Sequence, residues 1–275
     1  MILNLKELIF NLWKRPKITM PLVILFWGVY YIFFGAIINV NYGFGYDGYF
    51  YGKIALNFIE QVFGHQLSFY RIQRILPSFI VSAALSILNI HKNTFNIIKA
   101  FQILNLVLLI LSSFIWIEVC RHYKLNLKLI WIGFILWFLN FGIAKFTFYY
   151  PVLTDTTAFF LGFCLMYFHL KDNLTGKILV SLLGAFTFPT IHYFGALLIV
   201  FPINSKIEPD SNIKEGSSII KKALAFLFSI PFLLIANYYI RSYFQTGSLY
   251  LIIAPVIDQL LYISAFINFI VMFFF

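Results

Sequence analysis

Charged residues are scarce in this chain. Asp, Glu, Lys and Arg make up only 11% of its 275 residues, whereas an ordinary soluble domain has roughly a quarter. Hydrophobic residues make up 61% and aromatic residues 21%, and the mean hydropathy is +0.89. A water-exposed fold of this size needs far more polar side chains to cover its surface. The composition therefore excludes a soluble domain and indicates an integral membrane protein.

Cysteine and the common catalytic motifs are also scarce or missing. Cys120 and Cys164 are the only cysteines, and both lie in or beside apolar segments, which excludes a disulfide framework and a cysteine-based metal site. The sequence has no Walker loop, no HExxH motif and no GxSxG elbow. It also has no internal repeat and no linker long enough to separate domains. We therefore expect residues 1–275 to form a single integral-membrane domain.

The charge that is present is basic. The chain has 20 Lys and Arg residues against 10 Asp and Glu, a formal net charge of +10. Because short cytoplasmic loops of membrane proteins are rich in Lys and Arg, we interpret this excess as a topology signal and expect no nucleic-acid partner. Basic residues precede a first, uncleaved span at about residues 21–40, so we expect a cytoplasmic N-terminus, as in a multi-pass protein of a bacterial inner membrane. These residues are Lys6, Lys14, Arg15 and Lys17.

The remaining apolar runs predict an all-α, polytopic transmembrane bundle of about seven to nine membrane segments. They extend over residues 75–90, 100–117, 129–144, 156–170, 178–202, 223–240 and 249–275. The run 75–90 is short for a span of roughly 20 residues and begins beside two arginines, so we place it along the outer interface. This choice puts RHYKLNLK and KDNLTGK in the cytoplasm and returns Asp155 to the same outer face as Asp47.

Two further segments have a distinctive pattern. Residues 50–62 place Phe50, Ile54 and Phe58 on one helical face, which predicts an interfacial amphipathic helix directly after Asp47. The long run 178–202 contains Pro189, which predicts two half-spans that meet in a cavity. Residues 204–275 are expected to form a cytoplasmic loop and C-terminal spans. The sequence ends inside an apolar run, VMFFF, for which a truncated chain and a degenerate one are the two interpretations.

Polar residues near a membrane are costly unless they are paired or face water, so the few found here are candidate functional residues. Asp47, in the loop GFGYDGYFYG, can serve as a general base or bind a divalent cation, although a solvated turn also explains it. Arg71 and Arg74 are three residues apart and can grip a phosphate from one helix face. Their alternative role is to anchor the chain by snorkelling to the interface.

Four other residues have weaker signals. Asp155, in YYPVLTDTT, is explained by helix capping alone but shares the predicted face of Asp47. His192 lies at the break of an apolar run, where it is either a satisfied buried histidine or a ligand of a phosphate or metal. Lys145 and Arg241 lie at predicted span ends and can meet a lipid phosphate or snorkel. If a divalent metal is bound, the candidate ligands are Asp47, Asp155 and His192.

The order and sidedness of these motifs resemble the GT-C class of membrane glycosyltransferases, which includes protein mannosyltransferases and aminoarabinose transferases. The resemblance rests on YDGYFYGKIA, YRIQRILPSF, YYPVLTDTTAFFLGF and GKILVSLLGAFTFPTIHYFGALLIVFP, which cover most of residues 1–203. The chain departs from the class in lacking a second acid beside Asp47. It also has Pro-Thr-Ile-His where related proteins often have an Arg-Glu or Lys-Gly pair.

The resemblance implies a catalytic carboxylate at Asp47. It implies a donor-phosphate site at Tyr70, Arg71 and Arg74, with further substrate-binding positions at Asp155 and His192. The partners would be the lipid bilayer and a polyprenyl-phosphate-linked sugar, with an unidentified acceptor at the outer face. Three other functions fit the composition: a flippase or transporter of lipid-linked saccharides, a polysaccharide polymerase, and a non-catalytic membrane subunit.

Overall fold

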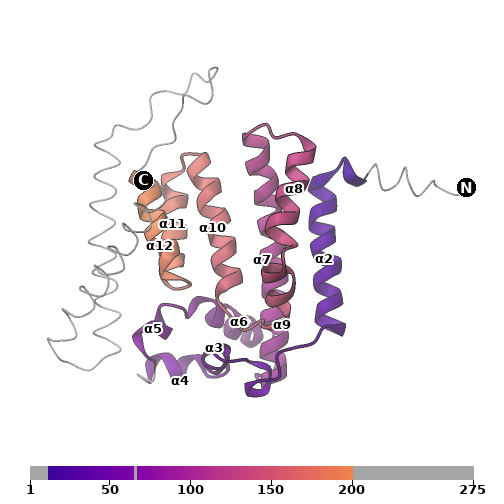
Figure 1. Ribbon diagram of the computed structural model, residues 1–275. Helices are drawn as coiled ribbons and strands as arrows, with labels where there is room; N and C mark the ends of the chain where they lie inside the picture. Colours follow the sequence, from indigo (N-terminus) through magenta and orange to yellow (C-terminus); the bar gives the residue numbers. More distant parts are fainter. Residues whose placement is uncertain (1–11, 65–66, 201–275) are drawn as a thin grey trace, which may run out of the picture. The chain divides into compact units, whose positions relative to one another are not determined.

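The structure is a computed structural model that describes residues 12–64 and 67–200, and the description below concerns this part of the chain (Figure 1). All its regular elements are helices, and it contains no strand. The all-α prediction is therefore confirmed. Arg241 and the apolar runs 223–240 and 249–275 lie outside the described residues.

Two helices are long and apolar enough to cross a membrane. They are α2, Pro16–Phe34, and α7, Thr94–His122. A third crossing is possible if α8, Leu127–Phe138, is joined with the segment Gly142–Tyr149, from which it is bent by 52°. This segment contains a π-helix, Gly142–Phe146, and α9, Thr147–Tyr149. The described part thus supplies two or three spans, and the higher count expected for the whole chain stays a prediction.

Several helices begin at an asparagine because its side chain accepts a hydrogen bond from an otherwise unpaired backbone N–H. Asn93 accepts from Asn96 at the start of α7, and Asn126 accepts from Leu129 at the start of α8. Asn173 does the same for α11, Leu174–Ala185, through the N–H of Gly176. These polar caps end the connecting turns and fix where each apolar helix begins.

The basic turns gather at one end of this part of the molecule. Helix α2 starts beside the α7–α8 turn, because Lys17 pairs with Glu118 at 3.3 Å and the Trp131 indole donates to the Trp13 carbonyl oxygen at 3.0 Å. The turn at residues 171–173, between α10, Asp155–Leu170, and α11, lies at the same end (Figure 1). We call this the basic end.

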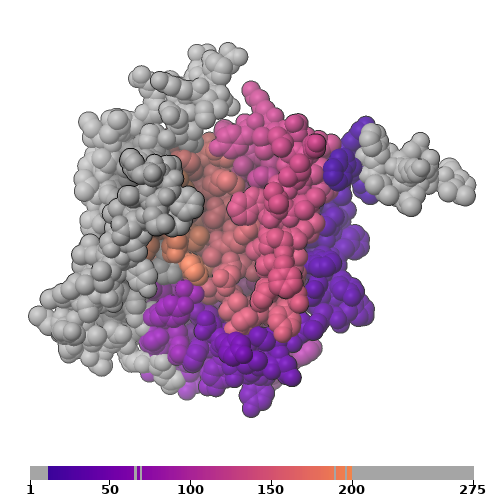
Figure 2. Space-filling view, viewed as in Figure 1, coloured from indigo at the N-terminus to yellow at the C-terminus, as the bar shows by residue number. Residues whose placement is uncertain are grey.

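Short helices occupy the opposite end, where the space-filling view shows them as a layer of indigo to purple atoms (Figure 2). They are a single 3₁₀ turn, Asn41–Gly43, and the helices α3, Gly48–Leu56; α4, Phe58–Phe63; α5, Phe69–Ile72; and α6, Leu76–Ile87. The 12 residues of α6 rise only about 18 Å, well short of the roughly 30 Å hydrocarbon core, so α6 is too short to cross, as its sequence predicts. We call this the rim end.

The expected amphipathic helix over residues 50–62 is divided in two. Helix α3 ends at Leu56 and α4 begins at Phe58, because Asn57 has φ −128° and ψ 56°, which is not helical. The expected break near Pro189 is present, since α11 and α12, Pro189–Val200, form a tight hairpin. A Cβ atom on Gly184 would lie 2.6 Å from Ile191 Cγ2, so this glycine allows the two helices to approach closely.

Candidate functional site

Asp47 lies at the rim end, directly before α3. Its side chain is exposed and makes no capping hydrogen bond, although it occupies the N-cap position. The loop that carries it is held in place by the amide of Asn41, which donates to the Gly45 carbonyl oxygen at 2.9 Å. The Gly48 N–H donates to the hydroxyl of Tyr150 at 3.2 Å. This last contact joins the Asp47 loop to the segment that leads into α10.

Glycines shape the Asp47 loop, and our sequence interpretation did not use their spacing. Gly43 and Gly45 have φ values of +93° and +78°, which other residues rarely adopt. A Cβ atom on Gly48 would lie 2.6 Å from the Val152 carbonyl oxygen. The three glycines match GxGxxG, but the dinucleotide-binding form of this motif requires a preceding strand, and here it follows α2. The pattern thus indicates a closely packed loop.

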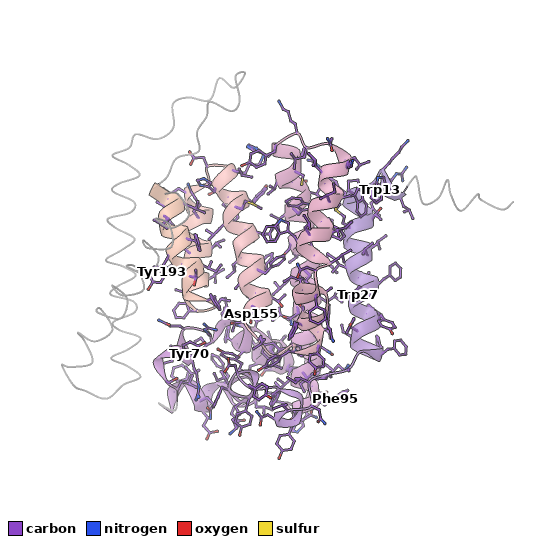
Figure 3. All side chains as sticks on the ribbon, in the orientation of Figure 1. Trp13, Trp27, Tyr70, Phe95, Asp155 and Tyr193 are labelled. Carbon is purple, nitrogen blue, oxygen red and sulfur yellow. The ribbon has the colours of Figure 1, made fainter. Side chains whose placement is uncertain are left out.

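Asp155 is the first residue of α10, and Figure 3 shows it at the lower end of that helix, in the half of the molecule that also holds Tyr70. Its side chain is exposed, and a carboxylate in the first turn is favoured by the helix dipole. Among the described residues, neither Asp155 nor Asp47 forms an ion pair. The structure therefore places both carboxylates at one end, in segments joined through Gly48 and Tyr150.

Two buried amides of α7 fix the segment before Asp155. The Asn105 amide donates to the carbonyl oxygens of Thr147 and Pro151, both at 3.0 Å. The Gln102 amide donates to the Phe148 carbonyl oxygen at 3.1 Å. Our sequence interpretation missed these two residues. Two amides three positions apart in an otherwise apolar helix are the signal that could have identified them.

The two arginines make separate aromatic contacts. The guanidinium carbon of Arg71 lies 3.3 Å from the centre of the Phe50 ring. That of Arg74 lies 4.4 Å from the Tyr70 ring centre and 4.3 Å from the Phe188 ring centre. Aromatic faces stabilise arginine without neutralising it, so the guanidinium N–H groups remain donors. Helix α5 ends at Ile72, which explains why the two arginines do not share one helical face.

Arg74 has an N–H donor that is not paired within the described residues. Its Nε is buried and has no hydrogen-bond partner in the described part of the chain. No carboxylate among those residues pairs with Arg74 or Arg71. Burial raises the pKa of Tyr51 to about 12, outweighing the opposite effect of Arg74. The phenol is therefore neutral and leaves the charge of Arg74 uncompensated.

Two other predicted site residues that the structure describes, His192 and Lys145, make separate contacts. His192 is buried within the α11–α12 hairpin, with Nδ1 3.0 Å from the Ser181 carbonyl oxygen. Lys145 lies on the π-helix, with Nζ 5.0 Å from the Phe141 ring centre and 5.5 Å from that of Tyr149. In residues 12–64 and 67–200, no three His, Cys, Asp or Glu side chains lie together as metal ligands. Asp47, Asp155 and His192 are thus not assembled as a metal site.

Comparison with known proteins does not assign the chain to a family: no protein-family model, curated protein or solved structure matches it.

Proposed function

We propose that this protein is a membrane glycosyltransferase that transfers a sugar from a polyprenyl-phosphate donor to an acceptor at the outer face. The observation that carries the proposal is the pair of arginines at the rim end, which have aromatic neighbours and no carboxylate partner within residues 12–64 and 67–200. Two uncompensated guanidinium groups are suited to binding a phosphate. The carboxylate of Asp47, which forms no ion pair with the other described residues, lies at the same end, directly before α3.

The proposed reaction uses these groups in complementary roles. The acceptor hydroxyl oxygen attacks the anomeric carbon of the sugar while the bond from that carbon to the phosphate oxygen breaks. The phosphate keeps the bonding electron pair and stays attached to the polyprenyl chain. Arg71 and Arg74 stabilise the growing phosphate charge, and Asp47 accepts the proton from the acceptor hydroxyl. No nucleotide-binding site is needed, because the donor is held by its lipid chain and its phosphate.

The proposal includes a membrane orientation. A polyprenyl chain stays in the bilayer while its phosphate reaches the interface, which suits a site at one end of a helical bundle. Because short basic loops stay in the cytoplasm, the basic end would face the cytoplasm and the rim end would face outward. A multi-pass protein of about seven to nine segments in a bacterial inner membrane, with its N-terminus inside, fits this orientation.

Replacing each arginine by lysine tests the function. Lysine keeps the charge but lacks the planar set of donors, so we expect Arg71→Lys and Arg74→Lys each to lower turnover about tenfold or more. The measurement is release of undecaprenyl phosphate by the protein in membrane vesicles of a bacterial host, which supply acceptor hydroxyls, after addition of undecaprenyl-phosphate-linked glucose, mannose or aminoarabinose.

The control is Arg121→Lys at the basic end, where Arg121 pairs with Glu118 at 3.0 Å on the surface. An exposed pair of this kind contributes little, so this variant should keep full turnover. Unchanged turnover in both rim variants would make these arginines membrane anchors. If the wild-type protein releases no phosphate from any of the donors, a transporter or a non-catalytic subunit becomes the better interpretation.

A further inference from the structure

Tyr42 combines high exposure with an unusual backbone conformation. Its side chain is 88% exposed, the highest value among the large hydrophobic side chains that the structure describes. Its φ of 59° and ψ of 27° are left-handed, a conformation that Gly, Asn and Asp tolerate and that is unusual for a bulky residue. Four other non-glycine residues in the described ranges have positive φ, and none of them is aromatic. Neither burial nor backbone preference therefore explains a tyrosine at this position.

The loop that carries this ring is held in one conformation. The Gly45 N–H donates to the Val40 carbonyl oxygen at 2.9 Å and closes the loop. The Phe44 ring is only 3% exposed and packs on α3, where a Cβ atom on Gly52 would lie 2.7 Å from it. Tyr46, two residues further on, is 69% exposed. The loop thus buries one ring and presents two others at its surface, at the rim end where the segment after α2 runs (Figure 1).

We propose that Tyr42 and Tyr46 form a platform on which the acceptor binds beside Asp47, and that this acceptor is a saccharide. The flat C–H faces of sugar rings stack on aromatic rings, while sugar hydroxyl groups need hydrogen-bond acceptors such as a carboxylate. Residues 42–47 supply both features. The inference rests on the proposed function, because it takes Asp47 as the base, and it adds the chemical class of the acceptor.

The charge of the loop favours a hydroxyl-bearing ligand over a phospholipid headgroup. Residues 35–47 contain no Lys or Arg, and Asp47 is their one charged residue. A carboxylate repels the phosphate of a headgroup, whereas it accepts hydrogen bonds from sugar hydroxyls. The cations suited to a phosphate, Arg71 and Arg74, belong to another segment of the rim end. The acceptor and the donor phosphate therefore have separate binding residues.

Saccharide binding tests the platform. The full-length protein is placed in phosphatidylcholine nanodiscs, because many detergents have sugar headgroups, and is titrated with maltotriose, cellotriose and chitotriose by saturation-transfer NMR. We expect at least one trisaccharide to bind, and Tyr42→Gly and Tyr46→Ala each to raise its Kd about fivefold, since one ring face is no longer covered from water. Tyr42→Phe and Tyr46→Phe keep the rings and should bind like the wild type. Tyr123→Ala, an exposed tyrosine at the basic end, is the matched control.

The unfolding temperature separates a ligand site from a packing role. Glycine adopts positive φ readily, so Tyr42→Gly should unfold at the wild-type temperature or above it while saccharide binding is weakened. A lower unfolding temperature of Tyr42→Gly, with saccharide binding unchanged, would mean that the ring supports the fold and binds no sugar.

Other outcomes overturn the platform without touching the donor site. If no trisaccharide binds the wild type, or if all variants bind equally, these rings are not a saccharide site. If the added fluorescence of Tyr42→Trp is quenched by nitroxide-labelled lipids and not by iodide, the ring is an interfacial membrane anchor. If a trisaccharide binds as expected but no donor releases undecaprenyl phosphate, the platform stands and the glycosyltransferase function is wrong.

Discussion

At the scale of single residues, the clearest feature is Asp47, whose carboxylate makes no contact that stabilises the described fold. Asp47 is exposed, makes no capping hydrogen bond and forms no ion pair in the described part of the chain. Surface substitutions away from such contacts usually change the free energy of unfolding by about 0.5 kcal/mol or less. Asp47 is therefore a position where loss of function and loss of stability can be separated.

We predict that Asp47→Asn unfolds at the wild-type temperature and abolishes sugar transfer from the polyprenyl-phosphate donor. An amide is close in size to a carboxylate but cannot accept the acceptor proton. Thermal unfolding in detergent and release of undecaprenyl phosphate are the two measurements. Glu60→Gln, an exposed acid on α4 at the same end, is the control and should remain active. Full activity of Asp47→Asn would remove its role as the base.

Sequence reasoning found the residue types of the site but not their contacts. Arg71 and Arg74 were expected to share one helical face, and this failed because α5 ends between them, at Ile72. Spacing rules for a helix hold only while the helix continues. The Phe188 ring beside Arg74 was not predictable either, since it belongs to a turn far along the chain. Tyr51 was one tyrosine among many until its burial distinguished it.

At the scale of elements, the break near Pro189 was predictable, while helix starts and local divisions were not: the expected cap Asp155 is the first helical residue, and Thr154 occupies the N-cap position. The apolar run 178–202 contains a proline, and the structure places a hairpin turn there. Residues 50–62 have an amphipathic pattern, yet the chain leaves helical geometry at Asn57. The amphipathic pattern predicts which side chains face the interior. It does not predict whether those side chains belong to one helix or to two. The π-helix at residues 142–146 likewise has no periodicity that would predict it.

The amides of α7 connect an apolar helix to the polar rim. Asn105 supplies both hydrogen bonds that its NH₂ group can make, to the carbonyl oxygens of Thr147 and Pro151. Both oxygens lie in the segment whose Tyr150 hydroxyl accepts from Gly48, next to Asp47. One buried side chain of a long helix therefore supports the segments of both carboxylates.

We predict that Asn105→Leu lowers the free energy of unfolding by about 1–3 kcal/mol for each carbonyl oxygen left without a donor. The measurement is thermal or denaturant unfolding in detergent, followed through the tryptophan fluorescence. Asn96→Leu is the control on the same helix: its amide donates to the His91 carbonyl oxygen at an exposed site, where water can replace it. Equal stability of Asn105→Leu and wild type would show that these two hydrogen bonds do not hold the segment.

At the scale of the whole molecule, it was predictable which loops lie at the same end. Charge counts in short loops grouped RHYKLNLK and KDNLTGK on one side, and the structure places both at the basic end (Figure 1). Asp47 and Asp155 were grouped on the other side and lie at the rim end. The span count stays a prediction, because the described residues supply only two or three candidate spans. Helices α6 and α11 have only 12 residues each, which agrees with a run that does not cross and with a run broken at Pro189.

The last prediction is that the rim end faces the outside of the cell and the basic end faces the cytoplasm, because positive loops are retained inside. In a chain whose Cys120 and Cys164 are replaced by Ala, single cysteines are introduced at Tyr46, Asp155 and Lys124, all of which are exposed. A membrane-impermeant maleimide added to intact spheroplasts should label positions 46 and 155, and should reach position 124 only after the membrane is opened. Labelling of 46 and 155 from opposite sides would remove the basis for a joint site. Labelling of all three from outside would mean that the basic end does not mark the cytoplasmic face, so the donor phosphate could not be assigned to the outer leaflet.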